Sequence, residues 1–181
     1  MFQTTVTLSP DLTEVERAQA IRDAFNNDRS QMTLMLAHQL KINEVEIIRA
    51  LEGDISHELD FSRWEEIIRA FEPLGNVHVI VSNGAATIEV FGQFGKFTNT
   101  DGFLNVRTQS LDMHIRSWEL AAVFAFRKPS HLDGHESLSF QFFDKRGNAA
   151  FKVFLNFGGK DPAPELVQTY GQLIEDFKKS N

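Results

Sequence analysis

Between residues 75 and 157, apolar and polar residues alternate along much of the chain, which is the pattern of β-strands with one buried face. The segment 110–117 shows this alternation most clearly. Successive side chains of an extended chain point to opposite faces, so this segment has two different sides. One side is formed by Leu111, Met113 and Ile115, and the other by Asp112, His114 and Arg116. We therefore predict a strand over residues 111–116 with its apolar side buried.

Six further strands are predicted by the same alternation or by short apolar runs between turn residues. They cover residues 77–81, 86–90, 103–106, 120–127, 138–143 and 149–157. Asn83-Gly84 joins the first two and is the strongest short hairpin signal. Asp144 to Gly147 joins the last two. The strand that ends near Pro129 is followed by a polar loop.

Helical periodicity occupies the first part of the chain and its end. The predicted helices begin near Ser9-Pro10-Asp11, Ser30, Asn43 and Asp60, and a fifth follows Pro164. Asn43 and Glu46 have the spacing of a capping box. The last helix has an apolar stripe made of Leu166, Val167, Tyr170, Leu173, Ile174 and Phe177.

This order of elements predicts an α+β fold, with N-terminal helices, a central antiparallel sheet of about seven strands and a C-terminal helix. We expect a helical region over residues 1–74 that packs on the sheet. Residues 75–181 should form the sheet module with its terminal helix, and the two regions should make one structural unit. A chain of 181 residues is long enough to bury its own core.

Composition and charge narrow the range of functions. The chain has no cysteine, which excludes disulfides, thiolate metal sites and cysteine nucleophiles. Its net charge of −7 argues against a nucleic-acid partner. We see no run long enough to insert in a membrane and no signal peptide, so we expect a cytoplasmic protein. The 17 phenylalanines predict a bulky sheet core, with an apolar pocket for a flat ligand as the alternative.

His114 and Arg116 form the candidate site with the most specific chemistry. They lie on the same side of the predicted strand, about 7 Å apart. An imidazole ligates metals, and a guanidinium binds carboxylates and phosphates. A ligand that needs both groups fits here better than elsewhere in the sequence. The pattern alone is equally compatible with two solvated residues on an outward sheet face.

Three other groups have simpler structural interpretations. Arg127-Lys128-Pro129 is either the protection of a strand edge or an anion site at the mouth of a cleft. His131 and His135 lie in a polar loop whose spacing matches no ordered metal site. Residues 32–50 have the layout of a helix-turn-helix, but their glutamates would face DNA phosphates, which favours structural packing. No hydrolase, kinase or nicotinamide-binding motif occurs.

Four stretches of the strand half resemble the haem-utilisation proteins of Gram-negative bacteria. They are residues 102–106 (GFLNV), 111–116 (LDMHIR), 122–129 (AVFAFRKP) and 139–155. One branch of these proteins is the single-module ChuX/HutX type of intracellular haem carrier, and the other is the HemS/ChuS type with two modules in tandem. A single module favours the carrier branch, although Arg127-Lys128-Pro129 is more similar to the tandem type.

The resemblance implies a cytoplasmic module that binds b-type haem after uptake and pairs as a homodimer. His114 stands where the carriers have a haem-site strand histidine, and Ser82 stands where they commonly have another. The implied site has His114 as the iron ligand and cationic partners for the propionates, with phenylalanines beside the macrocycle. These further residues are Arg116, Arg127, Lys128, Phe103 and Phe143.

The expected function is to carry haem and to exchange it with a donor or acceptor protein, not to catalyse a reaction. Two alternatives stay open. One is haem cleavage with an external reductant, as suggested for the tandem relatives. The other is a structural or regulatory dimer that has lost haem, which the serine at position 82 motivates.

Overall fold

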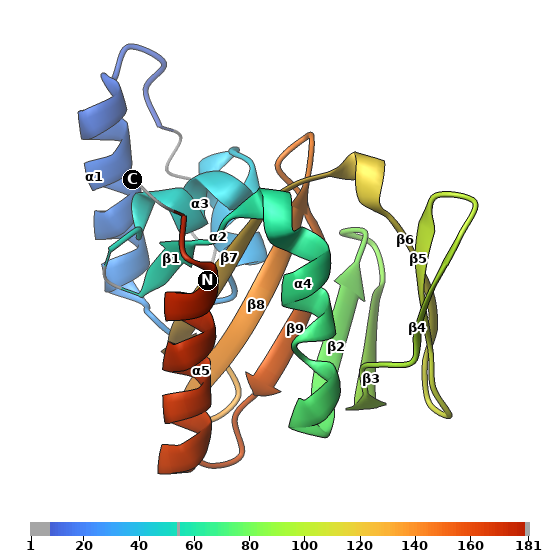
Figure 1. Ribbon diagram of the computed structural model, residues 1–181. Helices are drawn as coiled ribbons and strands as arrows, with labels where there is room; N and C mark the ends of the chain where they lie inside the picture. Colours follow the sequence, from blue (N-terminus) through green and yellow to red (C-terminus); the bar gives the residue numbers. More distant parts are fainter. Residues whose placement is uncertain (1–7, 54, 180–181) are drawn as a thin grey trace.

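The computed structural model describes residues 8–53 and 55–179, and it shows two antiparallel sheets with helices on both faces of the larger one (Figure 1). The helices are α1 (Glu14–Asn27), α2 (Thr33–Leu40), α3 (Glu44–Ala50), η1 (Phe61–Arg63), α4 (Trp64–Arg69), η2 (Glu72–Leu74), η3 (Ser117–Glu119) and α5 (Pro164–Phe177). The strands are β1 (Ser56–Glu58), β2 (Asn76–Ser82), β3 (Thr87–Gln93), β4 (Phe97–Thr100), β5 (Phe103–Arg107), β6 (Asp112–Arg116), β7 (Leu120–Pro129), β8 (Glu136–Asp144) and β9 (Ala149–Asn156). The predicted α+β class is confirmed.

The strands form two sheets in place of the single sheet of about seven strands that we predicted. The large sheet has the order β1-β7-β8-β9-β2-β3, and the small one has the order β4-β5-β6. All seven predicted strands are present. The two that were missed, β1 and β4, have only three and four residues, too short to show a clear alternation. β1 lies within the region that was predicted to be helical, and it pairs with β7.

Each face of the large sheet buries its own core, because neighbouring residues of a strand point to opposite faces. On β7, Val123 and Ala125 belong to one core with α4 and α5, whereas Phe124 and Phe126 belong to the other with α1, α2 and α3. Figure 1 shows α4 and α5 in front of the large sheet. Most phenylalanines of the strand half are buried in these cores, as expected for a bulky sheet interior.

Helix α1 begins later than predicted. Thr13 caps it: the Thr13 hydroxyl accepts a hydrogen bond from the backbone N–H of Glu16, and the Glu16 carboxylate accepts one from the backbone N–H of Thr13. This reciprocal arrangement satisfies two amides that would otherwise lack partners. The capping box predicted for Asn43 and Glu46 is confirmed at the start of α3. Of the helices in the described part of the chain, none is long and apolar enough to cross a membrane.

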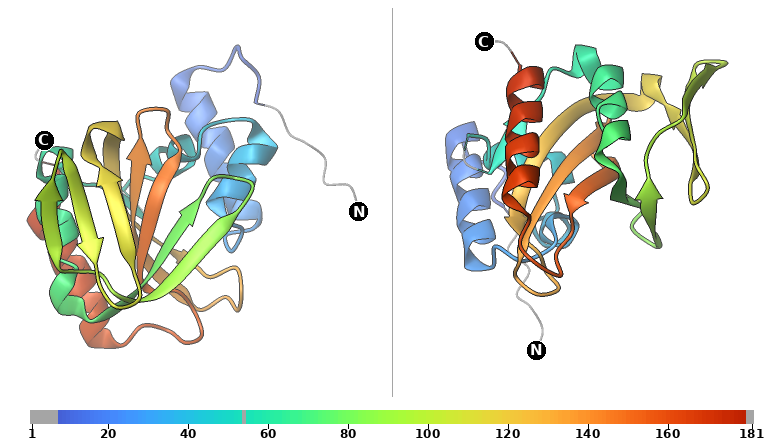
Figure 2. Two further views of the ribbon diagram at one scale, coloured as in Figure 1. Left: turned by 90° about the vertical axis from the view of Figure 1, so that its right-hand side faces the viewer. Right: turned by 60° about the horizontal axis from the view of Figure 1, so that its bottom comes forward.

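The small sheet projects from one end of the molecule, and we call it the flap (residues 97–116). It stands on the right of Figure 1 and faces the viewer on the left of Figure 2. The buried Phe94 anchors it, since the ring lies 6.1 Å from that of Phe71 and 5.8 Å from that of Phe97. Leu104, Val106 and Ile115 turn the apolar side of the flap into the core shared with α4 and α5.

Candidate functional site

The polar side of the flap brings together three of the six predicted site residues. Phe103 lies opposite Arg116 in the register of β5 and β6, and Asn105 lies opposite His114. The ring of Phe103 meets the imidazole of His114 edge to face at 6.4 Å, and the Arg116 guanidinium lies 5.9 Å from the centre of the Phe103 ring. The predicted alternation of buried and exposed side chains over residues 111–116 is confirmed.

His114 is held through one ring nitrogen, and its other nitrogen makes no hydrogen bond. Its Nδ1 lies 2.5 Å from Oδ1 of Asn105. Its Nε2 lies 3.7 Å from an oxygen of Asp112, which is beyond hydrogen-bond range. The side chain is 55% exposed. A neutral imidazole in this position has a lone pair on Nε2 with which to bind a metal.

A cavity of about 840 Å³ lies beside this group, and we call it the flap cavity. Its volume is within the range of small-molecule sites. Polar or aromatic side chains line one part of it: Thr98, Thr100, Asp101, Phe103, Asn105, Arg107, His114, Arg116 and Glu119. Apolar residues line the rest: Val81, Met113, Ile115, Leu120, Ala150 and Phe151. The flap cavity therefore combines an imidazole, two guanidinium groups, two carboxylates and an apolar wall.

Arg127 and Lys128 do not line the flap cavity, and they do not form one anion site with each other. Because they are neighbours on β7, their side chains point to opposite faces of the large sheet. Arg127 pairs with Glu136, at 2.5 Å between Nε and Oε1. Lys128 lies on the face of α2 and donates hydrogen bonds to the backbone carbonyls of Ser30 and Pro129. The alternative in which Arg127 and Lys128 together form one anion site therefore does not fit this geometry.

Phe143 also lies apart from the flap. It is fully buried in the core under α1, α2 and α3, where its ring meets that of Phe124 edge to face at 5.8 Å. A side chain with no exposed surface cannot flank a bound macrocycle. Its burial follows from its place at the end of β8, on the face of the sheet that these helices cover.

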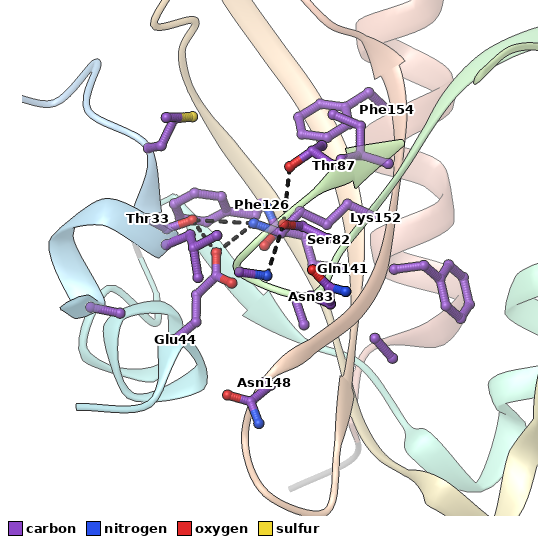
Figure 3. A pocket seen from close by; sticks show the side chains of 18 of the residues that line it. Thr33, Glu44, Ser82, Asn83, Thr87, Phe126, Gln141, Asn148, Lys152 and Phe154 are labelled. Carbon is purple, nitrogen blue, oxygen red and sulfur yellow. Dashed lines mark hydrogen bonds and ion pairs between the residues drawn. The ribbon is translucent and has the colours of Figure 1, made fainter. Parts of the chain in front are cut away.

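A second cavity, of about 650 Å³, lies on the opposite face of the large sheet beside α2, and we call it the α2 groove (Figure 3). Its apolar lining includes Ala37, Ile42, Ile80, Phe126, Phe154 and Phe157. Its polar lining includes Thr33, Glu44, Ser82, Asn83, Lys128, Gln141 and Lys152. The large sheet lies between this groove and the flap cavity: Ala150 and Phe151 border both, whereas the neighbours Val81 and Ser82 line different cavities.

Buried charges distinguish the α2 groove. Glu44 is 3% exposed and forms an ion pair with Lys152, and it also accepts a hydrogen bond from the Thr33 hydroxyl at 2.5 Å (Figure 3). Burial, together with repulsion by Lys152, lowers the pKa of Lys128 to about 8, and Asp28 only partly opposes this shift. Gln141 is 2% exposed, and its Oε1 has no hydrogen-bond partner. Because Glu44 already pairs with Lys152, the ammonium group that the groove offers to an anion is that of Lys128.

Ser82 lies at the tip of the hairpin between β2 and β3 and lines the α2 groove. Its hydroxyl accepts hydrogen bonds from the backbone N–H of Gly84 and from the Thr87 hydroxyl, and it donates one to the carbonyl of Ala86. In one copy of the chain, Ser82 and His114 therefore belong to different cavities.

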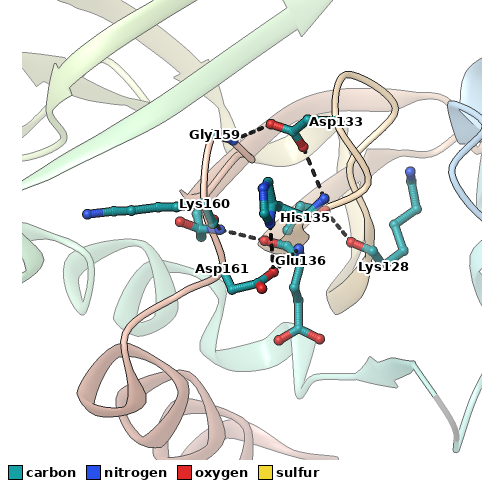
Figure 4. Close-up of polar contacts among 9 residues, drawn as sticks. Lys128, Asp133, His135, Glu136, Gly159, Lys160 and Asp161 are labelled. Atoms are coloured by element: carbon teal, nitrogen blue, oxygen red, sulfur yellow. Dashed lines mark hydrogen bonds and ion pairs between the residues drawn. The ribbon is translucent and has the colours of Figure 1, made fainter.

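The loop with His131 and His135 makes polar contacts with residues 159–161 (Figure 4). Asp133 accepts hydrogen bonds from the backbone N–H groups of Gly159 and His135, which lower the pKa of its carboxyl. The imidazole of His135 lies 3.2 Å from Asp161. Over residues 8–53 and 55–179, the structure shows no cluster of three or more histidine, aspartate and glutamate side chains that would hold a metal.

Sequence reasoning missed Asn105 on the flap and Glu44, Gln141 and Lys152 in the α2 groove. Lys152 leaves a signal, because it is the one charge inside the predicted strand 149–157. Asn105 leaves one as well, because it is a polar residue between the apolar Leu104 and Val106 and lies on the same side of the strand as Phe103. Neither signal identifies a partner, since Glu44 and Lys152 are 108 residues apart.

Comparison with known protein families identifies the family to which the chain belongs. A family model described as haem utilisation ChuX/HutX matches residues 57–173. The chain belongs to the ChuX/HutX family. Over 151 residues, this ChuX/HutX chain is 27% identical to the intracellular heme transport protein HutX of Vibrio cholerae serotype O1 (strain ATCC 39315 / El Tor Inaba N16961). The match covers 82% of this chain and 76% of HutX.

Solved structures share the fold. A crystal structure of ChuX superposes with a TM-score of 0.76 and 19% identity, covering 86% of this ChuX/HutX chain and 96% of that one. Protein AGR_C_4470 of Agrobacterium tumefaciens gives 0.77 and 21%, covering 96% and 99%. The heme degrading enzyme ChuS of Escherichia coli O157:H7 gives 0.75 and 20%, covering 93% of this chain and 48% of ChuS. The expected family and fold are therefore confirmed.

Proposed function

We propose that this chain binds haem in the cytoplasm and passes it to another protein. Membership of the ChuX/HutX family supports haem handling, and the name of HutX supports intracellular transport. One observation carries the proposal for this chain: His114, with Nε2 free of hydrogen bonds, stands beside Arg116 and Phe103 on a cavity of about 840 Å³. These are the groups that a flat, iron-bearing dicarboxylate requires.

Each residue of the flap has a distinct part in this proposal. His114 offers Nε2 to the iron of a b-type haem. Arg116 neutralises a propionate, because guanidinium groups bind carboxylates through charge-assisted hydrogen bonds. Phe103 and the apolar wall of the flap cavity would supply the apolar contacts to the macrocycle. Since the flap is open to solvent, this arrangement suits a carrier that must release its cargo.

We further propose that the binding unit is a homodimer. In one copy, His114 on the flap lines the flap cavity, whereas Lys128 on the large sheet lines the α2 groove. A haem that uses both residues therefore needs two copies, with the flap of one lying over the α2 groove of the other. ChuS supports this pairing, because the present chain matches only about half of its length. Arg127 has no place in such a site, since it pairs with Glu136 on the other face.

A titration with haemin tests the proposal. The wild-type chain should shift the Soret band and reach a stoichiometric endpoint. His114→Ala should weaken binding by more than about tenfold, because loss of even an outer-shell contact costs 10–100-fold. His135→Ala is the matched control, since His135 lies outside both cavities. Equal binding by His114→Ala and the control would remove His114 from the site, and no Soret shift at all would favour a dimer without haem.

Two further experiments separate the remaining alternatives. In an equal mixture of His114→Ala and Lys128→Ala after subunit exchange, about half of the dimers are mixed. If a site combines residues of two copies, each mixed dimer keeps one of its two sites, so about a quarter of the haemin sites should return. None should return if each copy binds alone. Incubating the haem complex with ascorbate and catalase should leave the Soret band intact for a carrier. Formation of a biliverdin-like product would instead show haem degradation.

A further inference from the structure

We propose that Asn105 is a positioning residue for His114: it holds the proton of the imidazole on Nδ1 and so leaves Nε2 available to iron. This role rests on the proposed function, because Nε2 is the atom that would bind the haem. A neutral imidazole carries its proton on either nitrogen, and the hydrogen bond made by one nitrogen decides which of them binds a metal.

The contact between the two side chains fixes the direction of the hydrogen bond. Asn105 and His114 face each other in the register of β5 and β6, with Oδ1 and Nδ1 2.5 Å apart. A carboxamide oxygen only accepts hydrogen bonds. Nδ1 must therefore be the donor, and the neutral ring carries its lone pair on Nε2.

The neighbouring strand fixes the orientation of the amide. Nδ2 of Asn105 donates a hydrogen bond to the backbone carbonyl of Thr98 on β4, at 3.2 Å. A flipped amide would place its oxygen against this carbonyl oxygen, and two acceptors would then face each other. The Thr98 carbonyl thus fixes the orientation of the Asn105 amide. The amide in turn fixes which nitrogen of the His114 imidazole carries the proton.

The far side of the imidazole offers no competing hydrogen bond. Asp112 approaches Nε2 only to 3.7 Å, and its second oxygen lies 3.4 Å from Nε of Arg107. Asp112 is therefore too far to hold a proton on Nε2 by a hydrogen bond. Metal-binding histidines usually donate their other N–H to an oxygen acceptor in this way, which orients the ring and raises its basicity.

The protein without haem provides the first test. Long-range ¹H–¹⁵N correlation spectra of the neutral imidazole, assigned by comparison with His114→Ala, should show the proton of His114 on Nδ1. Asn105→Leu should shift the ring toward the form protonated on Nε2. Asn99→Leu is the matched control, because Asn99 lies on β4 and donates to Glu65 away from His114. A proton on Nε2 in the wild type would overturn the proposal whether or not haem binds.

The haem complex provides the second test. Asn105→Leu should bind haemin about tenfold more weakly than the wild type. Asn105→Asp keeps an acceptor for Nδ1 but sets its second oxygen against the Thr98 carbonyl, so it should recover only part of the affinity lost in Asn105→Leu. It should also lower the reduction potential of the iron, because a carboxylate acceptor makes the imidazole a stronger donor. Wild-type affinity in Asn105→Leu, alongside lost binding in His114→Ala, would overturn the role of Asn105 alone. Absence of binding by the wild-type chain would instead overturn the proposed function.

Discussion

The polar side of the flap and the α2 groove differ in how they hold their charges. On the flap, the side chain of His114 is 55% exposed and that of Arg107 is 70% exposed, and both are solvated. In the groove, Glu44 is 3% exposed and Lys152 is 16% exposed. Exposed ion pairs contribute little to stability because water and salt screen them. A buried charge that loses its partner is costly.

Because of this difference, the flap residues that we propose for binding are not residues that stabilise the fold. The flap exposes the groups that we propose for haem, so they are free to change without affecting the core. The groove uses its charges to hold α3 to β9, so the same residues contribute to the fold. Lys128 is intermediate, since it is half-buried, its hydrogen bonds go to backbone carbonyls, and Asp28 compensates its charge only in part.

The largest expected effect is in the groove. Glu44→Leu should lower the free energy of unfolding by about 3–5 kcal/mol, because Lys152 would be left as a buried charge without its partner. Urea denaturation measures the change. Glu66→Gln is the control, since it breaks an exposed pair with Arg63 and should cost less than about 1 kcal/mol.

The double variant sharpens this prediction. Glu44→Leu combined with Lys152→Leu should recover much of the lost stability, because apolar residues of similar volume often replace a buried ion pair without loss. A cost below about 1 kcal/mol for Glu44→Leu alone would show that the groove is hydrated like the flap. The contrast between the two regions would then be wrong.

The sequence predicts the flap better than the groove because the flap is local. Residues 103–116 form a hairpin of two strands, so the alternation that predicts β6 also places His114 and Arg116 on one side. The same alternation predicts that Arg127 and Lys128, as neighbours on one strand, point to opposite faces of the sheet. The groove depends on contacts between α3 and β9, which no local pattern specifies. Burial of Phe143 likewise follows from helices more than 90 residues away in the sequence.

A smaller effect is expected from the pH dependence of Lys128. Its pKa falls from 10.5 in an exposed lysine to about 8 in the folded chain. The unfolded chain therefore binds more protons between pH 8 and pH 10.5, so folding stability should rise across this interval. Relative to Lys128→Met, the wild type should gain up to about 3 kcal/mol. Lys160→Met is the control, because Lys160 is exposed.

Haemin affinity should respond in the opposite direction to pH. If Lys128 contacts a propionate, its ammonium form is the binding form, and affinity should fall as the pH rises above 8. Lys128→Met should remove this fall. A stability difference that stays flat from pH 8 to pH 10.5 would show that Lys128 is as solvated as the charges of the flap.

The smallest change in stability is expected on the flap itself. His114→Ala and Arg116→Ala should each change the free energy of unfolding by less than about 0.5 kcal/mol, because exposed side chains outside special backbone positions contribute little. Haemin titration of the same two proteins should nevertheless show weaker binding, with the larger loss for His114→Ala. Losses of stability above about 2 kcal/mol would mean that the flap depends on these side chains to fold. The flap residues proposed for binding would then also stabilise the fold, as Glu44 and Lys152 do in the groove.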